Sequence, residues 1–250
     1  MTGIHILPVV GLGEVEPGTD LAATILAALQ QQGTPLEDGD ILIVTQKIVS
    51  KAEGCLIRLE EIEPSELALE WATRWDKDAR VVELVLRQSR RIVRMERGVI
   101  ISETHHGLVC ANAGVDCSNV GQDRATLLPV DPDASAERLR SALSAASGGI
   151  SLGVVISDTF GRAWREGQVN VAVGVAGVEP LRHFEGQLDP TGYELRVTML
   201  ATADELASAA ELVMGKLDRV PVALVRGLPE VLGDGSARDL VRPASMDLFR

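Results

Sequence analysis

The stretch that decides the fold runs from Val154 to Gly177 and reads VVISDTFGRAWREGQVNVAVGVAG. Two apolar runs rich in β-branched residues flank a polar segment, and an apolar run bounded by turn residues is typical of a buried strand. The pattern therefore predicts two buried strands with polar residues between them. Asp158 would lie at the carboxyl end of the first strand, where ligands gather in α/β proteins. Its carboxylate is well placed there to hold a metal ion or a substrate.

The composition is that of a globular chain without a broad basic surface. The chain has 250 residues, 46% of them hydrophobic, which is enough for one large domain or two modest ones. A net charge of −12 and an aromatic content of 3% argue against nucleic-acid binding, which needs a basic face or stacking platforms. The sequence shows no signal-peptide pattern, no apolar run long enough to span a bilayer and no disulfide framework. We expect a cytoplasmic protein with no nucleic-acid or membrane partner.

The rest of the chain predicts a mixed α/β or α+β fold, because strand and helix patterns alternate irregularly. Strands are predicted at Ile4–Val10, Ile41–Val44, Val99–Ser102, Leu195–Leu200 and Val222–Val225. A helix is predicted after Thr202, with Thr202 and Glu205 as its capping box. The expected sub-domains are residues 98–185 as one unit, and residues 1–97 together with 186–250 as the other.

A lysine-rich segment follows the strand predicted at Ile41–Val44. It contains Thr45, Gln46, Lys47, Ser50 and Lys51. Two lysines and two hydroxyl groups just past a strand suit phosphate oxygens, although a solvated loop would look the same. The segment has no P-loop signature, and Glu16 stands where a Rossmann glycine motif would need its third glycine. A nucleotide site in this chain would therefore belong to neither of those two folds.

A second polar segment, His105–Gly121, reads HHGLVCANAGVDCSNVG and carries Asp116 among small residues. Two carboxylates that converge, here Asp116 and Asp158, suit a hard divalent cation that also binds substrate phosphates. Alternatively, both aspartates could serve as turn or helix caps. A zinc site is a further alternative, although its residues fit no standard spacing; they would be His105, His106, Cys110 and Cys117.

Four segments together carry a resemblance to a known family. They are Asp40–Gly54 (DILIVTQKIVSKAEG), Gly107–Val120 (GLVCANAGVDCSNV), Ser157–Gly177 (SDTFGRAWREGQVNVAVGVAG) and Asp204–Lys216 (DELASAAELVMGK). In this order they resemble the coenzyme F420-0:γ-glutamyl ligase family, and the resemblance extends from Leu7–Val9 to Ala237–Pro243. Because the sequence stops at Arg250, it is similar to the stand-alone form without the nitroreductase-like domain that some bacterial members add.

The resemblance implies a fold and an activity. It implies an intertwined homodimer of two-domain α/β subunits. Each subunit would use GTP to join L-glutamate to coenzyme F420-0, and then add further γ-linked glutamates. The reaction would pass through an acyl phosphate, release GDP and phosphate, and require Mg²⁺ or Mn²⁺ together with K⁺.

The resemblance also implies roles for individual residues. Metal binding would fall to Asp116, Asp158 and Thr159. Nucleotide contacts would come from Leu7, Pro8, Val9, Val10, Thr45, Gln46, Lys51, Asn119, Met214, Gly215 and Lys216. Gln46 stands where the family often has Ser, and this difference would alter one hydrogen bond without abolishing nucleotide binding. Lys216 stands where some members carry a Gln or Glu that ligates a second metal, and a protonated lysine cannot ligate one.

The catalytic groups are less well defined by the sequence. Arg162 and Arg165 could clamp phosphate or carboxylate groups of the substrates, or form ion pairs with Glu166 or Asp158. Glu166 and His183 are candidates for the base that takes the proton from the glutamate amine. Two other functions remain open: a nucleotide-using amide ligase for a different carboxylate acceptor, and a GTP-binding dimer without turnover.

Overall fold

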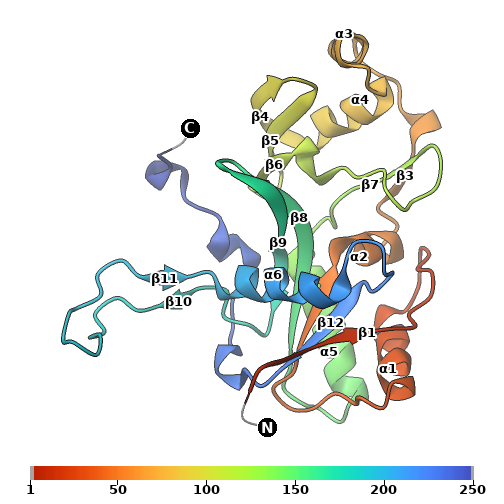
Figure 1. The fold of residues 1–250 in the computed structure, drawn as a ribbon. Coiled ribbons are helices and arrows are strands. Elements are labelled where there is room, and N and C mark those ends of the chain that lie inside the picture. The colour runs from red at the N-terminus through yellow and green to blue at the C-terminus, as the bar shows by residue number, and fades with distance from the viewer. Residues whose placement is uncertain (1–2, 249–250) are drawn as a thin grey trace.

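The computed structural model describes residues 3–248 and is built around one five-stranded mixed sheet (Figure 1). The strand order is β1 (His5–Val9), β12 (Val222–Arg226), β2 (Ile41–Thr45), β8 (Gly153–Arg162) and β9 (Arg165–Ala176). Only β2 and β8 run parallel, and the other neighbours are antiparallel. The mixed α/β class predicted from the sequence is therefore confirmed.

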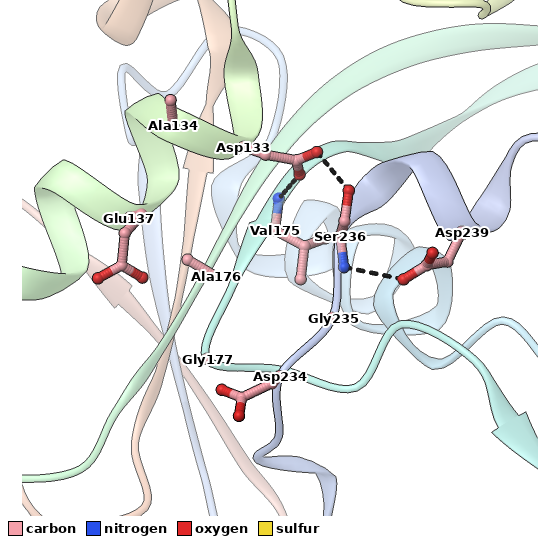
Figure 2. Close-up of a pocket in the computed structure, with 10 residues that line it drawn as sticks. All are labelled: Asp133, Ala134, Glu137, Val175, Ala176, Gly177, Asp234, Gly235, Ser236 and Asp239. Atoms are coloured by element: carbon pink, nitrogen blue, oxygen red, sulfur yellow. Dashed lines mark hydrogen bonds between the residues drawn. The ribbon is translucent and has the colours of Figure 1, made fainter.

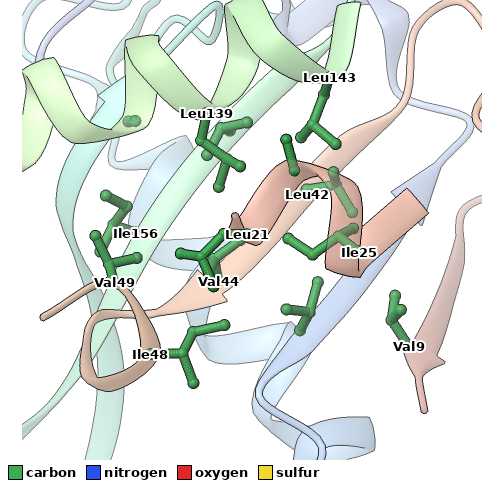
Figure 3. Packing of buried hydrophobic residues seen from close by; sticks show 14 of the residues in the cluster. Val9, Leu21, Ile25, Leu42, Val44, Ile48, Val49, Leu139, Leu143 and Ile156 are labelled. Carbon is green, nitrogen blue, oxygen red and sulfur yellow. The ribbon is translucent and has the colours of Figure 1, made fainter. Parts of the chain in front are cut away.

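Helices cover both faces of this sheet because the strands are apolar on both sides. Leu42 and Val44 of β2 face the helices α1 (Leu21–Gln31), α2 (Gln46–Ala52) and α5 (Pro132–Ala146), as Figure 3 shows. Ile41 and Ile43 point to the other face, which packs on α6 (Thr202–Met214). The four side chains are fully buried, and successive residues of a strand point to opposite faces. A strand covered on both faces reads as a continuous apolar run, which is why β2 was predictable.

A second group of elements has its own small core. It contains a three-stranded sheet and two helices: α3 (Glu66–Trp75), α4 (Ala79–Gln88), β4 (Ser89–Glu96), β5 (Val99–Thr104) and β6 (Val109–Ala111). The pair β3 (Leu56–Arg58) and β7 (Arg124–Thr126) links it to the rest. Short 3₁₀ helices occur at η1 (Leu59–Glu61), η2 (Asn112–Gly114), η3 (Pro229–Val231), η4 (Ala237–Leu240) and η5 (Ala244–Met246). The domain division stays a prediction; β8 and β9, from the expected 98–185 unit, are strands of the central sheet.

The segment that decides the fold differs from expectation in one respect. The first strand does not end at Asp158, because β8 continues to Arg162 and turns directly into β9. Its pairing with β2 stops at Ser157, but β9 remains paired as far as Arg162 and Arg165. Backbone groups beyond the edge of β2 are therefore still satisfied. The polar segment is the end of a long hairpin, which extends beyond the sheet toward the second group of elements (Figure 1).

Two local predictions were wrong. Only Met199–Leu200 of the expected strand at Leu195–Leu200 is extended, as β11, which pairs with β10 (Arg182–His183). These strands belong to an arm, residues 182–200, that projects from the body (Figure 1) and has no sheet to join. The capping box of α6 is absent because Thr202 lies inside the first turn, preceded by Ala201, and no side chain caps that end.

No helix within residues 3–248 is long and apolar enough to cross a membrane.

Close approach of α5 to the sheet depends on Gly174 in β9. A Cβ atom at this position would lie 2.4 Å from the carbonyl oxygen of Pro132, at the start of α5. We expect Gly174→Ala to lower the free energy of unfolding by about 1–3 kcal/mol, because backbone must shift to make room. The measurement is urea unfolding followed by circular dichroism.

Gly161→Ala is the matched control, since a Cβ there meets nothing within 4 Å on the same hairpin. It should change stability by no more than about 0.5 kcal/mol. Equal effects of the two substitutions would contradict the close approach.

Candidate functional site

The site lies where the parallel strands β2 and β8 reach their shared carboxyl edge. Thr45 pairs with Ser157 as the last step of that ladder. Asp158 follows immediately on β8, while α2 begins at Gln46 directly after β2. Lys47, in the first turn of α2, is therefore brought to the same edge as Asp158. Ligand sites of α/β proteins commonly form at this edge, because loops and helix starts converge there.

Asp158 is a partly buried carboxylate with an unusual proton affinity. Its Oδ1 accepts a hydrogen bond of 2.8 Å from the backbone N–H of Thr159. Burial raises its pKa from 3.8 to about 6, because desolvation penalises the charged form, and the negative charge of Asp116 acts in the same direction. Lys47 and Lys216 oppose the shift. The two aspartates are thus close enough for their charges to interact.

Asp116 is held from both its backbone and its side chain. Its N–H and C=O form a bridge with Thr126 of β7, at 3.1 and 2.8 Å. Its Oδ2 lies 2.7 Å from the ammonium of Lys47, which also donates to the hydroxyl of Ser118 at 2.7 Å. Burial acts to raise the pKa of Asp116, but the bonds from Lys47 and Ser118 outweigh it and keep the pKa below its usual value. The two carboxylates therefore have opposite pKa shifts.

Thr159 presents its hydroxyl on the other side of β8. Its oxygen accepts a hydrogen bond of 2.8 Å from Lys216 Nζ and donates one of 2.8 Å to Asn170 Oδ1 on β9. Lys216 reaches this point because the chain turns sharply at Gly215, which has a φ of +62° and no room for a Cβ beside Asp218. Two carboxylates, one hydroxyl and two ammonium groups are therefore brought to this end of β8 by β8 itself, α2, the segment before β7 and the turn after α6, with Lys47 paired to Asp116 and Lys216 bonded to Thr159.

Comparison with known proteins places the chain in a family. The sequence profile of the family described as F420-0:Gamma-glutamyl ligase matches residues 10–227, which include every one of these groups. The chain belongs to the F420-0:gamma-glutamyl ligase family.

Curated relatives match over nearly the whole length. The coenzyme F420:L-glutamate ligase of Methanothermobacter thermautotrophicus is 49% identical over 251 aligned residues, covering 99% of each chain. The ligase of the same name from Methanopyrus kandleri is 46% identical, covering 99% of this chain and 98% of its own. The ligase of the same name from Archaeoglobus fulgidus is 40% identical, covering 99% of this chain and 96% of its own.

The nucleotide residues implied by the family resemblance lie in several environments. The strand β1 and its end carry Leu7 to Val10, and β2 ends at Thr45. Lys51 lies in α2, where its ammonium is 3.7 Å from a carboxylate oxygen of Glu14. Gln46 is buried, and its Oε1 accepts a hydrogen bond from Ser50, so its amide is used within α2. Met214 is buried at the end of α6, while Asn119 is exposed with a φ of +57°. Their roles in nucleotide binding stay predictions.

The catalytic candidates do not contact the two aspartates in the described chain. Arg162, Arg165 and Glu166 are exposed at the end of the β8–β9 hairpin. The guanidinium of Arg162 bonds to the backbone carbonyls of Glu166 and Gly167, rather than to the carboxylates expected as its ion-pair partners. His183 lies on the projecting arm. Their roles also stay predictions.

The residues of the zinc alternative are used elsewhere. The imidazole of His105 faces the carbonyl of Arg87, and that of His106 faces the carbonyl of Pro129. Cys110 is buried in β6, where burial raises the pKa of its thiol to about 12. Residues 3–248 contain no group of three His, Cys, Asp or Glu side chains placed to hold a metal ion. The structure therefore gives the zinc alternative no support.

A cavity of about 470 Å³ lies away from this site, between the start of α5, the end of β9 and residues 234–239 (Figure 2). Its most buried carboxylate is occupied by structural bonds. Asp133 accepts from the N–H of Val175 at 2.8 Å, the hydroxyl of Ser236 at 2.6 Å and the N–H of Ala237 at 2.9 Å. The cavity thus marks where the C-terminal segment is tied to α5.

Three contributors to the site were not predicted in the roles they have here. Lys47 pairs with the carboxylate of Asp116, a contact that the two sequence interpretations, phosphate binding and a solvated loop, did not include. Asn170 and Glu211 lie in the segments quoted from the sequence but were given no role, although both support Thr159. The sequence carried one signal, an asparagine inside an apolar β-branched run. No local pattern could show that it faces Glu211 on a helix 41 residues away.

The raised pKa of Asp158 predicts a pH-dependent cost to stability. As pH rises from 3.8 to about 6 the unfolded chain loses this proton and the folded chain keeps it, so folded stability falls across that window. Asp158→Asn should therefore raise the free energy of unfolding at neutral pH by about 1–3 kcal/mol and have little effect near pH 4. Urea unfolding in EDTA, from about pH 4 to pH 8, measures this difference.

Asp116→Asn is the control with the opposite sign. The pKa of Asp116 is lowered in the folded state, so its ionised form adds stability at neutral pH that is lost on acidification. This variant should be less stable than the wild type at neutral pH. A stabilising effect of both substitutions would contradict the assignment of opposite shifts.

Proposed function

We propose that this protein is a GTP-dependent ligase that joins L-glutamate to coenzyme F420-0 and then adds further γ-linked glutamates. The names of its full-length relatives support the acceptor and the amino acid. The observation that carries the proposal is the convergence of Asp116, Asp158 and Thr159 with the ammonium groups of Lys47 and Lys216. This combination suits a phosphorylated nucleotide bound with a metal ion.

The donor set suits Mg²⁺ or Mn²⁺. Carboxylate and hydroxyl oxygens are hard ligands, and Mg²⁺ is commonly bound by one or two carboxylates with water and substrate phosphates as its other ligands. Asp116, Asp158 and Thr159 would hold the ion. When bound, it would neutralise charge on the phosphate oxygens. K⁺ is proposed as an additional requirement, without an assigned ligand.

The chain's own residues would bind the reacting groups and neutralise their charge. In the first step a carboxylate oxygen of F420-0 attacks the γ-phosphorus of GTP, the bond to the β-phosphate oxygen breaks, and GDP leaves. In the second the glutamate amine attacks the acyl carbon, phosphate leaves, and a base takes the amine proton. Lys47 and Lys216 would interact with phosphate oxygens, since both ammonium groups already lie at the site. Glu166 and His183 remain the candidate bases, and Arg162 and Arg165 the candidate clamps.

The direct test incubates the protein with GTP, L-glutamate, Mg²⁺ and F420-0 and follows GDP release and product mass. We expect GDP release that depends on F420-0, and products heavier by whole glutamate residues. Asp158→Asn should lower the rate by about 100-fold or more, although it stabilises the fold. Asp76→Asn, at the exposed end of α3, should leave the rate unchanged.

Other outcomes would identify a different function. GDP release that ignores F420-0 but follows another carboxylate would indicate an amide ligase with a different acceptor. GTP binding without phosphate release, and unaffected by Asp158→Ala, would indicate a nucleotide-binding dimer without turnover. Either result contradicts the proposal.

We propose that two copies of the chain associate through the arm. Its apolar side chains Leu188, Tyr193, Val197 and Met199 are exposed, and an isolated hairpin in water is marginally stable. Exposed apolar groups on such an element are typical of an interface. We expect a homodimer in light scattering coupled to size exclusion, and dissociation to monomers on Val197→Asp.

Val130→Asp is the control, because Val130 is 86% exposed and Val197 is 91% exposed, but only Val197 lies on the arm. A monomeric wild type, or equal effects of both substitutions, would contradict an arm-mediated dimer.

A further inference from the structure

A chain of three hydrogen bonds joins the end of α6 to both strands of the hairpin. Lys216 Nζ donates to Thr159 Oγ1 at 2.8 Å, and Thr159 Oγ1 donates to Asn170 Oδ1 at 2.8 Å. Asn170 Nδ2 then donates to Glu211 Oε2 at 2.8 Å. Glu211 lies in the last turn of α6, and Lys216 lies just past its end. The chain therefore starts and ends on the same element and passes through β8 and β9.

Asn170 is the buried centre of this chain. Its exposed fraction is 2%, and it lies opposite Thr159 in the β8–β9 ladder. Its backbone carbonyl also accepts a hydrogen bond from Ser208 Oγ at 2.7 Å. A buried amide in these surroundings is costly to leave unpaired, so both ends of the side chain must keep their partners. The side chain of Asn170 is consequently held at both ends, by Thr159 and by Glu211.

The chemistry of the four groups fixes the direction of the bonds. A carboxylate oxygen can only accept, so Glu211 requires the NH₂ end of the Asn170 amide. The carbonyl end then faces Thr159 and can only accept, so the Thr159 hydroxyl must donate its single proton to Asn170. The lone pairs of Thr159 Oγ1 are left facing the ammonium of Lys216, which can only donate.

We propose that Asn170 is a positioning residue: together with Glu211 it holds the Thr159 hydroxyl as an acceptor directed at the cation that lies against it. In the structure this cation is the ammonium of Lys216, and the same lone pairs would serve the metal ion of the nucleotide complex. The effect on metal binding rests on the proposed function, whereas the hydrogen-bond geometry involves only residues of this chain. Without Asn170 the hydroxyl could rotate and direct its proton toward the cation, which would weaken binding.

The first measurement needs no nucleotide. The ¹³Cε order parameter of Lys216, assigned with a Lys216→Met variant, reports how firmly the ammonium is held. We expect a restrained side chain in the wild type, even though Lys216 is exposed, and a mobile one in Asn170→Ala. Ser208→Ala is the matched control, because the Ser208 hydroxyl donates to the backbone carbonyl of Asn170 and not to its side chain, and it should keep Lys216 restrained. A mobile Lys216 in the wild type would overturn the inference.

The second measurement is a double-mutant cycle on the dissociation constant of Mn²⁺ with GTP. Asn170→Ala should weaken binding by about 10- to 100-fold, the range found for groups that orient metal ligands, and Ser208→Ala should change it less than about twofold. Thr159→Val removes the hydroxyl. If Asn170 acts through it, adding Asn170→Ala to Thr159→Val should cause no further loss. Additive losses would indicate a merely structural role and overturn the inference.

Two results separate this inference from the proposed function. A wild type that does not bind Mn²⁺ with GTP overturns the proposed function and the inference with it. A wild type that binds, with Asn170→Ala binding equally well, overturns the inference alone. Should Asn170→Ala not fold, Glu211→Gln replaces it: it keeps the shape but removes the acceptor-only constraint, so it should also weaken binding. Unchanged binding by Glu211→Gln would then overturn the inference.

Discussion

The parallel pairing of β2 with β8 is the constraint on which the rest of the site depends. Its register ends at Thr45 opposite Ser157, so the residues that follow on both strands emerge at the same edge. Lys47 is brought there at the start of α2, and Asp158 by the continuation of β8. A register shift of one residue would turn Asp158 to the other face of the sheet. The buried apolar side chains on both faces of β2 and β8 hold the register.

The pKa values of the two aspartates are set by desolvation, which raises them, and by nearby positive charge, which lowers them. Asp158 has lost water without gaining a direct cationic partner, so its pKa rises, whereas Asp116 has Lys47 at 2.7 Å and its pKa falls. The fold thus contains a carboxylate whose ionised form is destabilised by burial. Such local costs are common where a protein binds a cation, because the ligand later supplies the missing charge. The positive charge of Lys216 also favours the ionised form of Asp158.

Much of this could be read from the sequence, for identifiable reasons. The strands β2 and β12 are short apolar runs bounded by turn residues, and the mixed class followed from their irregular alternation with helices. The convergence of Asp116 and Asp158 was predicted because both follow apolar runs among small residues. The strand at Leu195–Leu200 was predicted wrongly, because apolar residues on an exposed arm produce the same pattern as a core strand. The capping box failed because Thr202 is drawn into the first turn of α6 and buried.

The sequence by itself determined the apolar segments, the polar residues between them and the membership of a family, since these depend on residue type and order along the chain. Only the tertiary structure decided that β8 continues past Asp158, because the pairing that sustains it comes from β9. Only the tertiary structure paired Lys47 with Asp116 and joined Glu211 to Lys216 through Asn170 and Thr159. Hydrogen bonds and ion pairs act over a few ångströms, and folding alone brings such distant segments within that range.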